Sequence, residues 1–287
     1  MGEQAAALRR IIEEPGLVPL VGAYDVLSAR LAEQSGFPAI HVGGYNLSAS
    51  RLGMPDVGFL TMAENLDALR AITGRVSIPV LADGDDGYGN HLNVTRLVRE
   101  LERAGVAGVH IEDQVFPKRC GHMEGKRVVS RADMVAKIAA AVDARRDADF
   151  VVVARTDAAA VTGFDDALER AAAYAEAGAD VLFVEAPEQE EQVATIARRI
   201  GKPLIYNWCF GGKSPDVAPA RLSAMGFKFL LLTDVLFAVA HTLRDLYAEV
   251  RHTGTYAGFA PRMVPFAEFN RIVGMGEVEA LDQRYGR

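Results

Sequence analysis

The residues best suited to chemistry in this chain form the run Lys118-Arg119-Cys120-Gly121-His122, which comes shortly after Glu112 and Asp113. Cationic neighbours lower the proton affinity of a thiol towards neutrality, where Cys120 could give or take a proton. The alternative interpretation is a small buried cysteine in an ordinary solvated basic loop. The position of the run, just past an apolar segment that ends in carboxylates, favours a catalytic role for Cys120.

Polar side chains also close many of the short apolar runs of the chain: Asp83 and Asp85, Glu112, Arg155 and Asp157, Glu185, and Asn207. Burying several carboxylates together without a cation is costly, because each loses hydration and repels the others. A divalent ion removes that cost, and oxygen ligands without a histidine pair favour Mg²⁺, with Mn²⁺ as a substitute. We therefore expect a metal at Asp83, Asp85 and Glu112, and a helix-capping role for Asp86 and Asp157.

Two glycine-rich segments lie next to these residues. Asp86-Gly87-Tyr88-Gly89-Asn90 follows the aspartates, and Gly43-Gly44 ends another apolar run. Both could bring backbone N–H groups close to a substrate carboxylate, and both could equally be simple turns. The first segment matches neither a Walker motif nor a dinucleotide fingerprint.

The elements that must position these residues are eight short apolar runs separated by helical patterns such as Met134–Arg145 and Asp165–Ala177. Runs that are apolar on both faces are typical of parallel strands covered by helices. Their alternation predicts a single (β/α)8 TIM barrel over residues 1–287, with a doubly wound open sheet as the alternative. The predicted strands are Leu17–Gly22, Ala39–Gly44, Val80–Asp83, Gly108–Glu112, Phe150–Arg155, Val181–Glu185, Leu204–Asn207 and Phe227–Leu232.

In such a barrel the C-terminal ends of the strands carry the active site, which is where the polar residues lie. Residues 253–287 exceed what the barrel needs, and their helical pieces are punctuated by Gly254, Pro261 and Pro265. We expect this extension to be helical and to pack on a neighbouring subunit.

The composition indicates an enzyme of the reducing cytoplasm. A net charge of −7 argues against nucleic acid and anionic membranes as partners. Two cysteines, Cys120 and Cys209, make no disulfide framework. The N-terminus does not read as a signal peptide, and no apolar run approaches the roughly 20 residues that span a bilayer.

Taken together, four segments resemble the isocitrate lyase/phosphoenolpyruvate mutase superfamily over about residues 15 to 250: Asp83–Asn90, His110–Gln114, Pro117–His122 and Ala154–Asp157. Tyr24-Asp25 and Leu52–Asp56 fit it as well. The resemblance implies a Mg²⁺-dependent barrel that binds 2-keto or 2-hydroxy acids and stabilises an enolate at the metal. It also implies a homotetramer in which a C-terminal helix is swapped between paired subunits.

The same resemblance implies roles for individual residues. Asp83 would bind the metal directly, while Asp56, Asp85 and Glu112 would hold metal-bound waters. Arg155 would hold the substrate carboxylate, helped by the backbone of Gly43, Gly44 and Tyr45. The remaining expected substrate contacts and catalytic groups are Tyr24, Lys118, Arg119, Gly121, His122, Glu185 and Asn207.

Within the superfamily, a cysteine in this loop resembles the pattern of the carbon–carbon lyases. This resemblance implies that Cys120 is the general acid. Cleavage of a 2-hydroxy dicarboxylate leaves a keto acid and an enolate-like fragment that needs a proton, which a thiol can supply. We expect His122 to tune that thiol, with bridging to Glu112 or another carboxylate as the alternative. Cys209, beside Trp208, is expected to be a packing residue.

Departures from the methylisocitrate lyase pattern narrow the expected substrate. Tyr45 replaces a small residue, Phe210 stands where a glutamate is usual, and an arginine of that pattern aligns near Ala238. These changes favour a smaller or more apolar alkylmalate over a tricarboxylate.

Three other functions stay open. The Lys118–Arg127 segment also resembles carboxyphosphonoenolpyruvate phosphonomutases, which would make the reaction a P–C rearrangement. An oxaloacetate hydrolase is the second alternative. A barrel that binds a keto acid without turning it over is the third.

Overall fold

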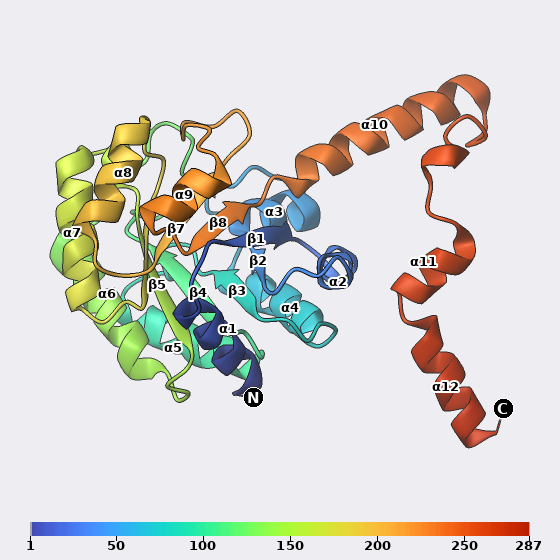
Figure 1. Cartoon of the computed structure of the whole chain (residues 1–287), viewed down its shortest axis with the longest axis horizontal. Helices are drawn as coiled ribbons and strands as arrows, with labels where there is room; N and C mark the ends of the chain where they lie inside the picture. The colour runs from blue at the N-terminus through green and yellow to red at the C-terminus, as the bar shows by residue number, and fades with distance from the viewer. Residues whose placement is uncertain (1, 287) are drawn as a thin grey trace.

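The structure, a computed structural model, describes residues 2–286. Eight parallel strands close into one barrel in sequence order, and helices surround it (Figure 1). The predicted (β/α)8 barrel is therefore confirmed and the open sheet is excluded. The strands are β1 (Val18–Ala23), β2 (Ile40–Val42), β3 (Val80–Asp83), β4 (Gly108–Glu112), β5 (Val151–Thr156), β6 (Val181–Val184), β7 (Leu204–Trp208) and β8 (Phe229–Leu232).

The helices follow the strands in alternation, apart from α1, which precedes β1, and the helices beyond β8. No helix within residues 2–286 combines the length and the apolar character needed to cross a bilayer. Three short elements, η1 (Ser48–Leu52), η2 (Ala158–Ala160) and η3 (Ala260–Arg262), interrupt the loops. The helices are α1 (Glu3–Glu13), α2 (Val26–Gln34), α3 (Gly44–Leu47), α4 (Met62–Thr73), α5 (His91–Arg103), α6 (Arg131–Ala144), α7 (Phe164–Glu176), α8 (Glu190–Arg199), α9 (Pro219–Met225), α10 (Val235–Thr253), α11 (Phe266–Ile272) and α12 (Met275–Tyr285).

The strands form because their side chains are buried on both sides of the sheet. One apolar cluster fills the inside of the barrel and includes Leu20, Leu81 and Phe183. Leu8 of α1 joins this cluster, so α1 closes the N-terminal end of the barrel. A second and larger cluster lies between the strands and the covering helices. These clusters leave the C-terminal end of the barrel open to the polar side chains that end the strands.

A buried polar network fixes the ends of β4 and β5 at that open end. The carboxylate of Asp113 accepts hydrogen bonds from Thr156 Oγ1 at 2.7 Å and from the backbone N–H of Asp157 at 2.9 Å. From α7, Tyr174 Oη donates to the same carboxylate at 2.8 Å, and Arg170 Nη1 lies 3.2 Å from it. Because these contacts join two strands and a helix, they hold the strand ends in a fixed relation.

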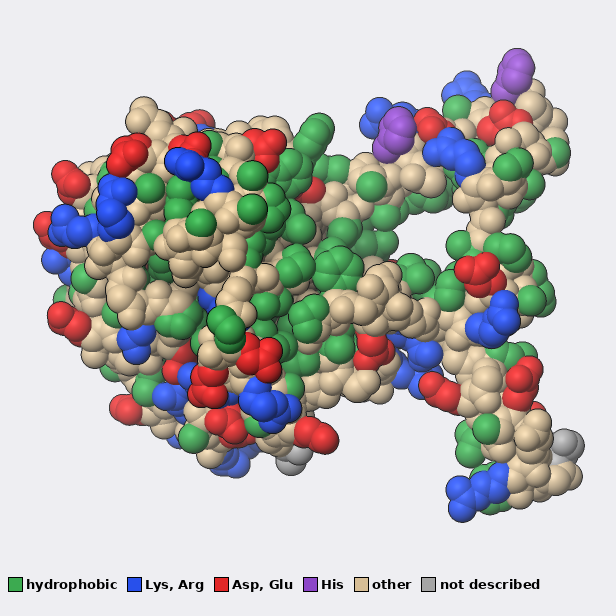
Figure 2. Space-filling view, in the orientation of Figure 1, with side chains coloured by type: hydrophobic (Ala, Val, Ile, Leu, Met, Phe, Trp, Pro, Cys, Tyr) green, Lys and Arg blue, Asp and Glu red, His purple; other side chains and the backbone are tan. Residues whose placement is uncertain are grey.

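The C-terminal arm, residues 235–286, leaves the barrel with α10 (Figure 1). It touches the barrel again at α2, where Gln34 Nε2 donates to Ile272 O at 3.3 Å and Arg30 lies 3.8 Å from Glu277. The sequence places the extension from residue 253 on, but α10 already projects from the barrel. None of the residues of α10, α11 and α12, all of them described, is buried. Hydrophobic side chains lie along the arm and on the barrel surface that faces it (Figure 2). Phe266 and Tyr285 of the arm are 83% and 71% exposed.

Candidate active site

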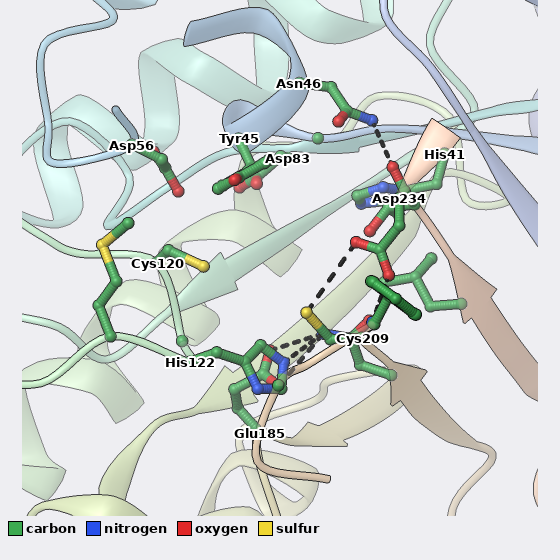
Figure 3. A pocket seen from close by; sticks show the side chains of 18 of the residues that line it. His41, Tyr45, Asn46, Asp56, Asp83, Cys120, His122, Glu185, Cys209 and Asp234 are labelled. Carbon is green, nitrogen blue, oxygen red and sulfur yellow. Dashed lines mark hydrogen bonds and ion pairs between the residues drawn. The ribbon is translucent and has the colours of Figure 1, made fainter. Parts of the chain in front are cut away.

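A cavity of about 190 Å³ opens at the C-terminal end of the barrel, where side chains from most of the strands meet (Figure 3). Many of the residues predicted from the sequence line it: Gly43, Tyr45, Asp56, Asp83, Cys120, Gly121, His122, Arg155, Glu185 and Asn207. Thr233, Asp234 and Phe237 also line it, and they belong to the segment Thr233–Ala238 that the sequence pointed to, with Tyr45 and Phe210, as selecting the substrate. Other lining residues were not predicted, among them His41, Asn46, His110, Met123, Phe183 and Cys209.

Asp83, the last residue of β3, is held on both carboxylate oxygens. Its Oδ2 accepts a hydrogen bond from the backbone of Gly44 at 2.8 Å, and its Oδ1 accepts one from the backbone of Asp85 at 2.9 Å. His110 Nε2 lies 2.9 Å from the same Oδ1. Burial acts to raise the pKa of Asp83, but His110 and Lys118 together bring that pKa well below its usual value. Asp83 is therefore an oriented carboxylate anion.

His110 belongs to a buried pair of histidines under Asp83. His41 Nε2 lies 3.2 Å from His110 Nδ1, and the two rings are stacked. Burial lowers the pKa of His41 to about 3, so His41 is neutral. The sequence carried a signal for His110, which stands two residues before Glu112 on β4 and so points to the same side of the strand.

Lys118 lies between two further carboxylates. Its Nζ is 2.7 Å from Asp56 Oδ1 and 2.6 Å from Asp85 Oδ1. Although burial opposes the charged form, Asp85 and Asp56 raise the pKa of Lys118 well above its usual value. Burial raises the pKa of Asp85 to about 7 in spite of this contact with Lys118. Lys118 thus neutralises charge in the acidic cluster, which consists of Asp56, Asp83, Asp85 and Glu112. It does not line the cavity.

Glu112 ends β4 behind the cavity, and its side chain is fully buried. Within residues 2–286, neither of its carboxylate oxygens has a hydrogen-bond partner, and Arg155 Nη1 lies 3.2 Å from Oε2. Burial raises its pKa well above the usual value. The two carboxylate oxygens of Glu112 are thus free hydrogen-bond acceptors close to Asp83 and Asp85.

The acidic cluster fits a hard divalent cation. All its side-chain donors are oxygens, the type that Mg²⁺ prefers, and the unpartnered oxygens of Glu112 could accept hydrogen bonds from metal-bound waters. A Cβ at Gly44 would lie 2.8 Å from Asp85 Oδ1, so only glycine leaves this space open. Among the described residues, no three His, Cys, Asp or Glu side chains are placed to bind one ion together. One direct ligand with the rest acting through water is therefore the arrangement that fits, because Mg²⁺ keeps several waters.

Cys120 faces the cavity from the loop after β4 (Figure 3), and its backbone N–H donates to Asp56 O at 3.0 Å. The expectation that basic neighbours lower its pKa is wrong, because burial raises the pKa of the Cys120 thiol to about 11. Lys118 is engaged with the acidic cluster, and the exposed Arg119 donates to the carbonyl of Glu124. The thiol is thus protonated at neutral pH, as a proton donor must be.

The side chain of His122 contacts a carboxylate, which was the alternative expected for it. His122 Nε2 lies 3.3 Å from Glu185 Oε1 and 3.3 Å from Asn207 Nδ2. Its Nδ1 accepts a hydrogen bond from the backbone of Lys213 at 3.1 Å. The side chain therefore joins the loop after β4 to the ends of β6 and β7.

Arg155 of β5 carries the one guanidinium or ammonium group among the residues that line the cavity. It lies against three carboxylates: Glu112 at 3.2 Å, Asp157 at 3.0 Å and Glu185 at 3.4 Å. Asp157 was expected to cap a helix, but its side chain makes no capping hydrogen bond. It binds Arg155 instead, and the spacing of two residues, which places both side chains on the same side of the extended chain, is the sequence signal for this contact.

The outer wall of the cavity is aromatic. The ring of Phe237 lies 6.0 Å from that of Tyr45 and 6.4 Å from that of Phe210, between ring centroids. Asp234 accepts a hydrogen bond from the backbone of Phe210 at 2.6 Å and so fixes this wall. Cys209, expected to be a packing residue, also lines the cavity, and its Sγ is 3.9 Å from Asp234 Oδ1.

Several expected substrate contacts lie outside the cavity. Gly44, Lys118 and Arg119 do not line it, although the first two touch the acidic cluster behind it. Tyr24 lies in a different hollow, together with Asp25, Ser50 and Arg51.

Comparisons with known proteins agree with this site and fold. Residues 8–251 match the phosphoenolpyruvate phosphomutase family. The chain is 42% identical over 282 residues to a 2,3-dimethylmalate lyase of Eubacterium barkeri, covering 98% of each chain. It is 43% identical over 284 residues to a 2-methylisocitrate lyase of Escherichia coli, covering 98% of this chain and 96% of the relative.

Solved structures extend the likeness to the whole chain. A structure of oxaloacetate acetylhydrolase in complex with 3,3-difluorooxalacetate superposes with a TM-score of 0.92 at 34% identity, covering 99% of this chain and 97% of the other. A 2,3-dimethylmalate lyase, a member of the PEP mutase/isocitrate lyase superfamily, superposes with a TM-score of 0.93 at 34% identity, covering 100% of this chain and 96% of the other. The barrel, the cavity at its C-terminal end and these relatives together show that the chain belongs to the PEP mutase/isocitrate lyase superfamily.

Proposed function

We propose that the protein is a Mg²⁺-dependent carbon–carbon lyase that cleaves a 2-hydroxy dicarboxylate of the alkylmalate type to a 2-keto acid and a carboxylic acid. The observation that carries the proposal is that the Cys120 thiol and the Arg155 guanidinium face one cavity beside an acidic cluster. The relatives named 2,3-dimethylmalate lyase and 2-methylisocitrate lyase support the same reaction class.

For the metal, we propose Asp83 as the direct ligand and Asp56, Asp85 and Glu112 as acceptors for its waters. The bound cation would stabilise the negative charge that develops on the oxygen of the nascent keto group. The orientation of Asp83 by Gly44 and His110 prepares this ligand, because a carboxylate held on both oxygens does not have to reorganise.

The chain's own residues would bind the substrate and move its protons. Arg155 holds the carboxylate next to the 2-hydroxyl, and Asn207 and His122 contact the second carboxylate. Cleavage breaks the bond between carbons 2 and 3, and the hydroxyl proton passes to a carboxylate that faces the cavity. The electron pair remains on carbon 3, where the Cys120 thiol donates the proton that completes the carboxylic acid product.

The outer part of the cavity favours a substrate that carries an apolar substituent. Its wall carries Tyr45, Phe210 and Phe237, and Asp234 adds a negative charge at that edge. A third carboxylate would meet no free cation there, since Arg155 lies against three carboxylates already. We therefore expect alkylmalates to be cleaved in preference to 2-methylisocitrate.

A product screen by mass spectrometry tests this function, with alkylmalates, 2-methylisocitrate, oxaloacetate and phosphonopyruvate as candidates, each with Mg²⁺ and with chelator. We expect Mg²⁺-dependent release of a keto acid from an alkylmalate. Cys120→Ser should lower kcat by about 10² or more, in the range that loss of a general acid produces. Cys209→Ser is the matched control, because it removes the other thiol of the cavity and should cost much less.

Three results would contradict the proposal. Oxalate release from oxaloacetate would indicate a hydrolase, and phosphonate rearrangement that survives Cys120→Ser would indicate a mutase. Keto-acid binding without turnover of any candidate would indicate a binding protein.

We also propose that the C-terminal arm packs on a second copy of the chain, as part of a homotetramer. Its support is the exposure of the arm's apolar side chains, such as Phe266, on helices that have no buried residue of their own. The superposition on a solved structure of this superfamily covers 100% of the chain, so the arm is included in the match.

A further inference from the structure

The Cys120 loop, residues 115–129, is closed on the barrel by three cationic or imidazole groups. Lys118 contacts the acidic cluster and His122 contacts Glu185, as described above. The third contact is made by Lys126, near the far end of the loop, whose side chain is only 2% exposed. Lys126 does not line the cavity, so it cannot touch a substrate there.

The ammonium group of Lys126 makes two contacts, and each is with a residue next to the site. Its Nζ donates to the carbonyl of Gly121, the residue next to Cys120. It also lies 3.1 Å from Asp157 Oδ1, and the Asp157 side chain is fully buried. One side chain therefore joins the segment that carries the thiol to the end of β5.

Asp157 in turn fixes the guanidinium of Arg155. Nε donates to Oδ2 at 3.0 Å and Nη2 donates to Oδ1 at 3.1 Å, which is a two-point contact that sets the plane of the guanidinium group. Lys126 shares Oδ1 with Arg155. The thiol-bearing loop and the one cation of the cavity are thus connected through a single carboxylate.

The loop also packs tightly against the site at Gly121. A Cβ on Gly121 would lie 2.5 Å from Arg155 Nη2 and 2.5 Å from Glu185 Cγ, so the loop backbone rests directly on these two side chains. A small rotation of Arg155 would therefore displace Gly121, and an open loop would remove this steric restraint on the guanidinium.

We propose that Lys126 is a positioning residue that couples closure of the Cys120 loop to the orientation of Arg155 through Asp157. The inference rests on the proposed function, in which Arg155 binds the keto-acid carboxylate and Cys120 supplies the proton. Loss of the Lys126 ammonium leaves Arg155 as the one ion-pair partner of Asp157 among the described residues. Arg155 is then drawn further towards Asp157, and the loop loses its inner anchor.

Lys126→Met tests the coupling, because methionine keeps the length of the side chain and removes its charge. The measurement is the rate at which iodoacetamide labels Cys120, followed by peptide mass spectrometry with Cys209 as the internal reference. It is made with and without pyruvate. We expect Cys120 labelling to rise about tenfold or more, since removing one partner of a buried ion pair leaves the other uncompensated. We also expect pyruvate to slow the labelling of Cys120 in the unchanged protein and to have no such effect in the variant.

Two further variants make the result specific. Lys126→Arg should restore slow labelling to within about threefold, because it retains the positive charge. Lys213→Met is the matched control: it removes an ion pair between another lysine and Glu124 of the same loop, but Glu124 is 85% exposed, so labelling should be unchanged. Lys126→Gln is measured in parallel, so that a folding defect in the methionine variant does not decide the outcome.

Labelling needs no turnover, so the inference can fail separately from the proposed lyase. Labelling and pyruvate protection equal to the unchanged protein in both Lys126→Met and Lys126→Gln would overturn it, whatever their melting temperatures. Pyruvate that binds by calorimetry but does not protect Cys120 in the unchanged protein would overturn it as well. Absence of pyruvate binding would count against the proposed function, and the rise in labelling would still decide whether Lys126 anchors the loop.

Discussion

At the scale of single residues, burial outweighs the local charges of the sequence. Cys120 has Lys118 and Arg119 as chain neighbours, yet the folded loop turns one towards the acidic cluster and leaves the other in solvent. What remains around the thiol is protein interior, which disfavours the thiolate. The thiol is thereby kept protonated, as its proposed role of general acid requires, and is a poor nucleophile.

The pH dependence of thiol labelling follows from this environment. The pKa of Cys120 is raised to about 11, so the thiol is protonated below that pH and the reactive thiolate forms only as pH approaches it. We expect the rate of iodoacetamide labelling of Cys120, in the presence of chelator, to keep increasing up to about pH 11. Cys209, whose pKa burial raises to about 12, should reach its plateau later still. A plateau for Cys120 at or below pH 9 would contradict the burial argument.

At the scale of elements, the ends of β4 and β5 decide the geometry of the site. Glu112 and Arg155 stand opposite each other in the register of these two strands. Asp113 holds both strand ends by accepting hydrogen bonds from Thr156 and from the backbone of Asp157. The plane of the Arg155 guanidinium therefore depends on a carboxylate that does not touch it.

Removal of that carboxylate should destabilise the barrel. In Asp113→Ala, Arg170 loses a charged partner, and the hydroxyls of Thr156 and Tyr174 lose their acceptor in a buried place. We expect the free energy of unfolding to fall by about 3 kcal/mol or more, as is usual when one member of a buried polar network is removed. Urea unfolding measures this change. Asp143→Ala, at an exposed position of α6, is the control and should change the stability by less than about 0.5 kcal/mol.

The strands were predictable from the sequence because each is an apolar run, and many of these runs have a polar residue at the end. Asp83, Glu112 and Arg155 were found for the same reason, since the C-terminal ends of parallel strands meet in a barrel. The contact between Lys126 and Asp157 was not predicted, because 31 residues separate them and no spacing rule relates their side chains. Tyr24 also follows a strand, but in the structure it lies in another hollow.

At the scale of the whole molecule, the chain consists of a barrel and an arm that touches its own barrel at the start of α10 and again at α2. The arm is well supplied with large apolar side chains, including Phe266, Phe269, Val278 and Leu281, all of them exposed. Apolar surface of this extent is typical of an interface between proteins. Together with the apolar barrel surface that faces the arm (Figure 2), it supports assembly through exchanged arms.

Sedimentation equilibrium tests the assembly. The unchanged protein should have a mass of several chains, and Phe266→Asp with Phe269→Asp should reduce that mass, because charges placed in an apolar interface cannot be compensated. Glu268→Gln, on the same helix α11, should leave the mass unchanged. A single-chain mass for the unchanged protein, or no change in the double variant, would contradict the proposal.

The departure of α10 from the barrel has a consequence for folding. In a (β/α)8 barrel the helix after the last strand normally covers the outer face where the sheet closes, but none of the nineteen residues of α10, each of which the structure describes, is buried. If a second chain supplies this cover, folding and association become one equilibrium, and dilution destabilises the barrel as a denaturant would.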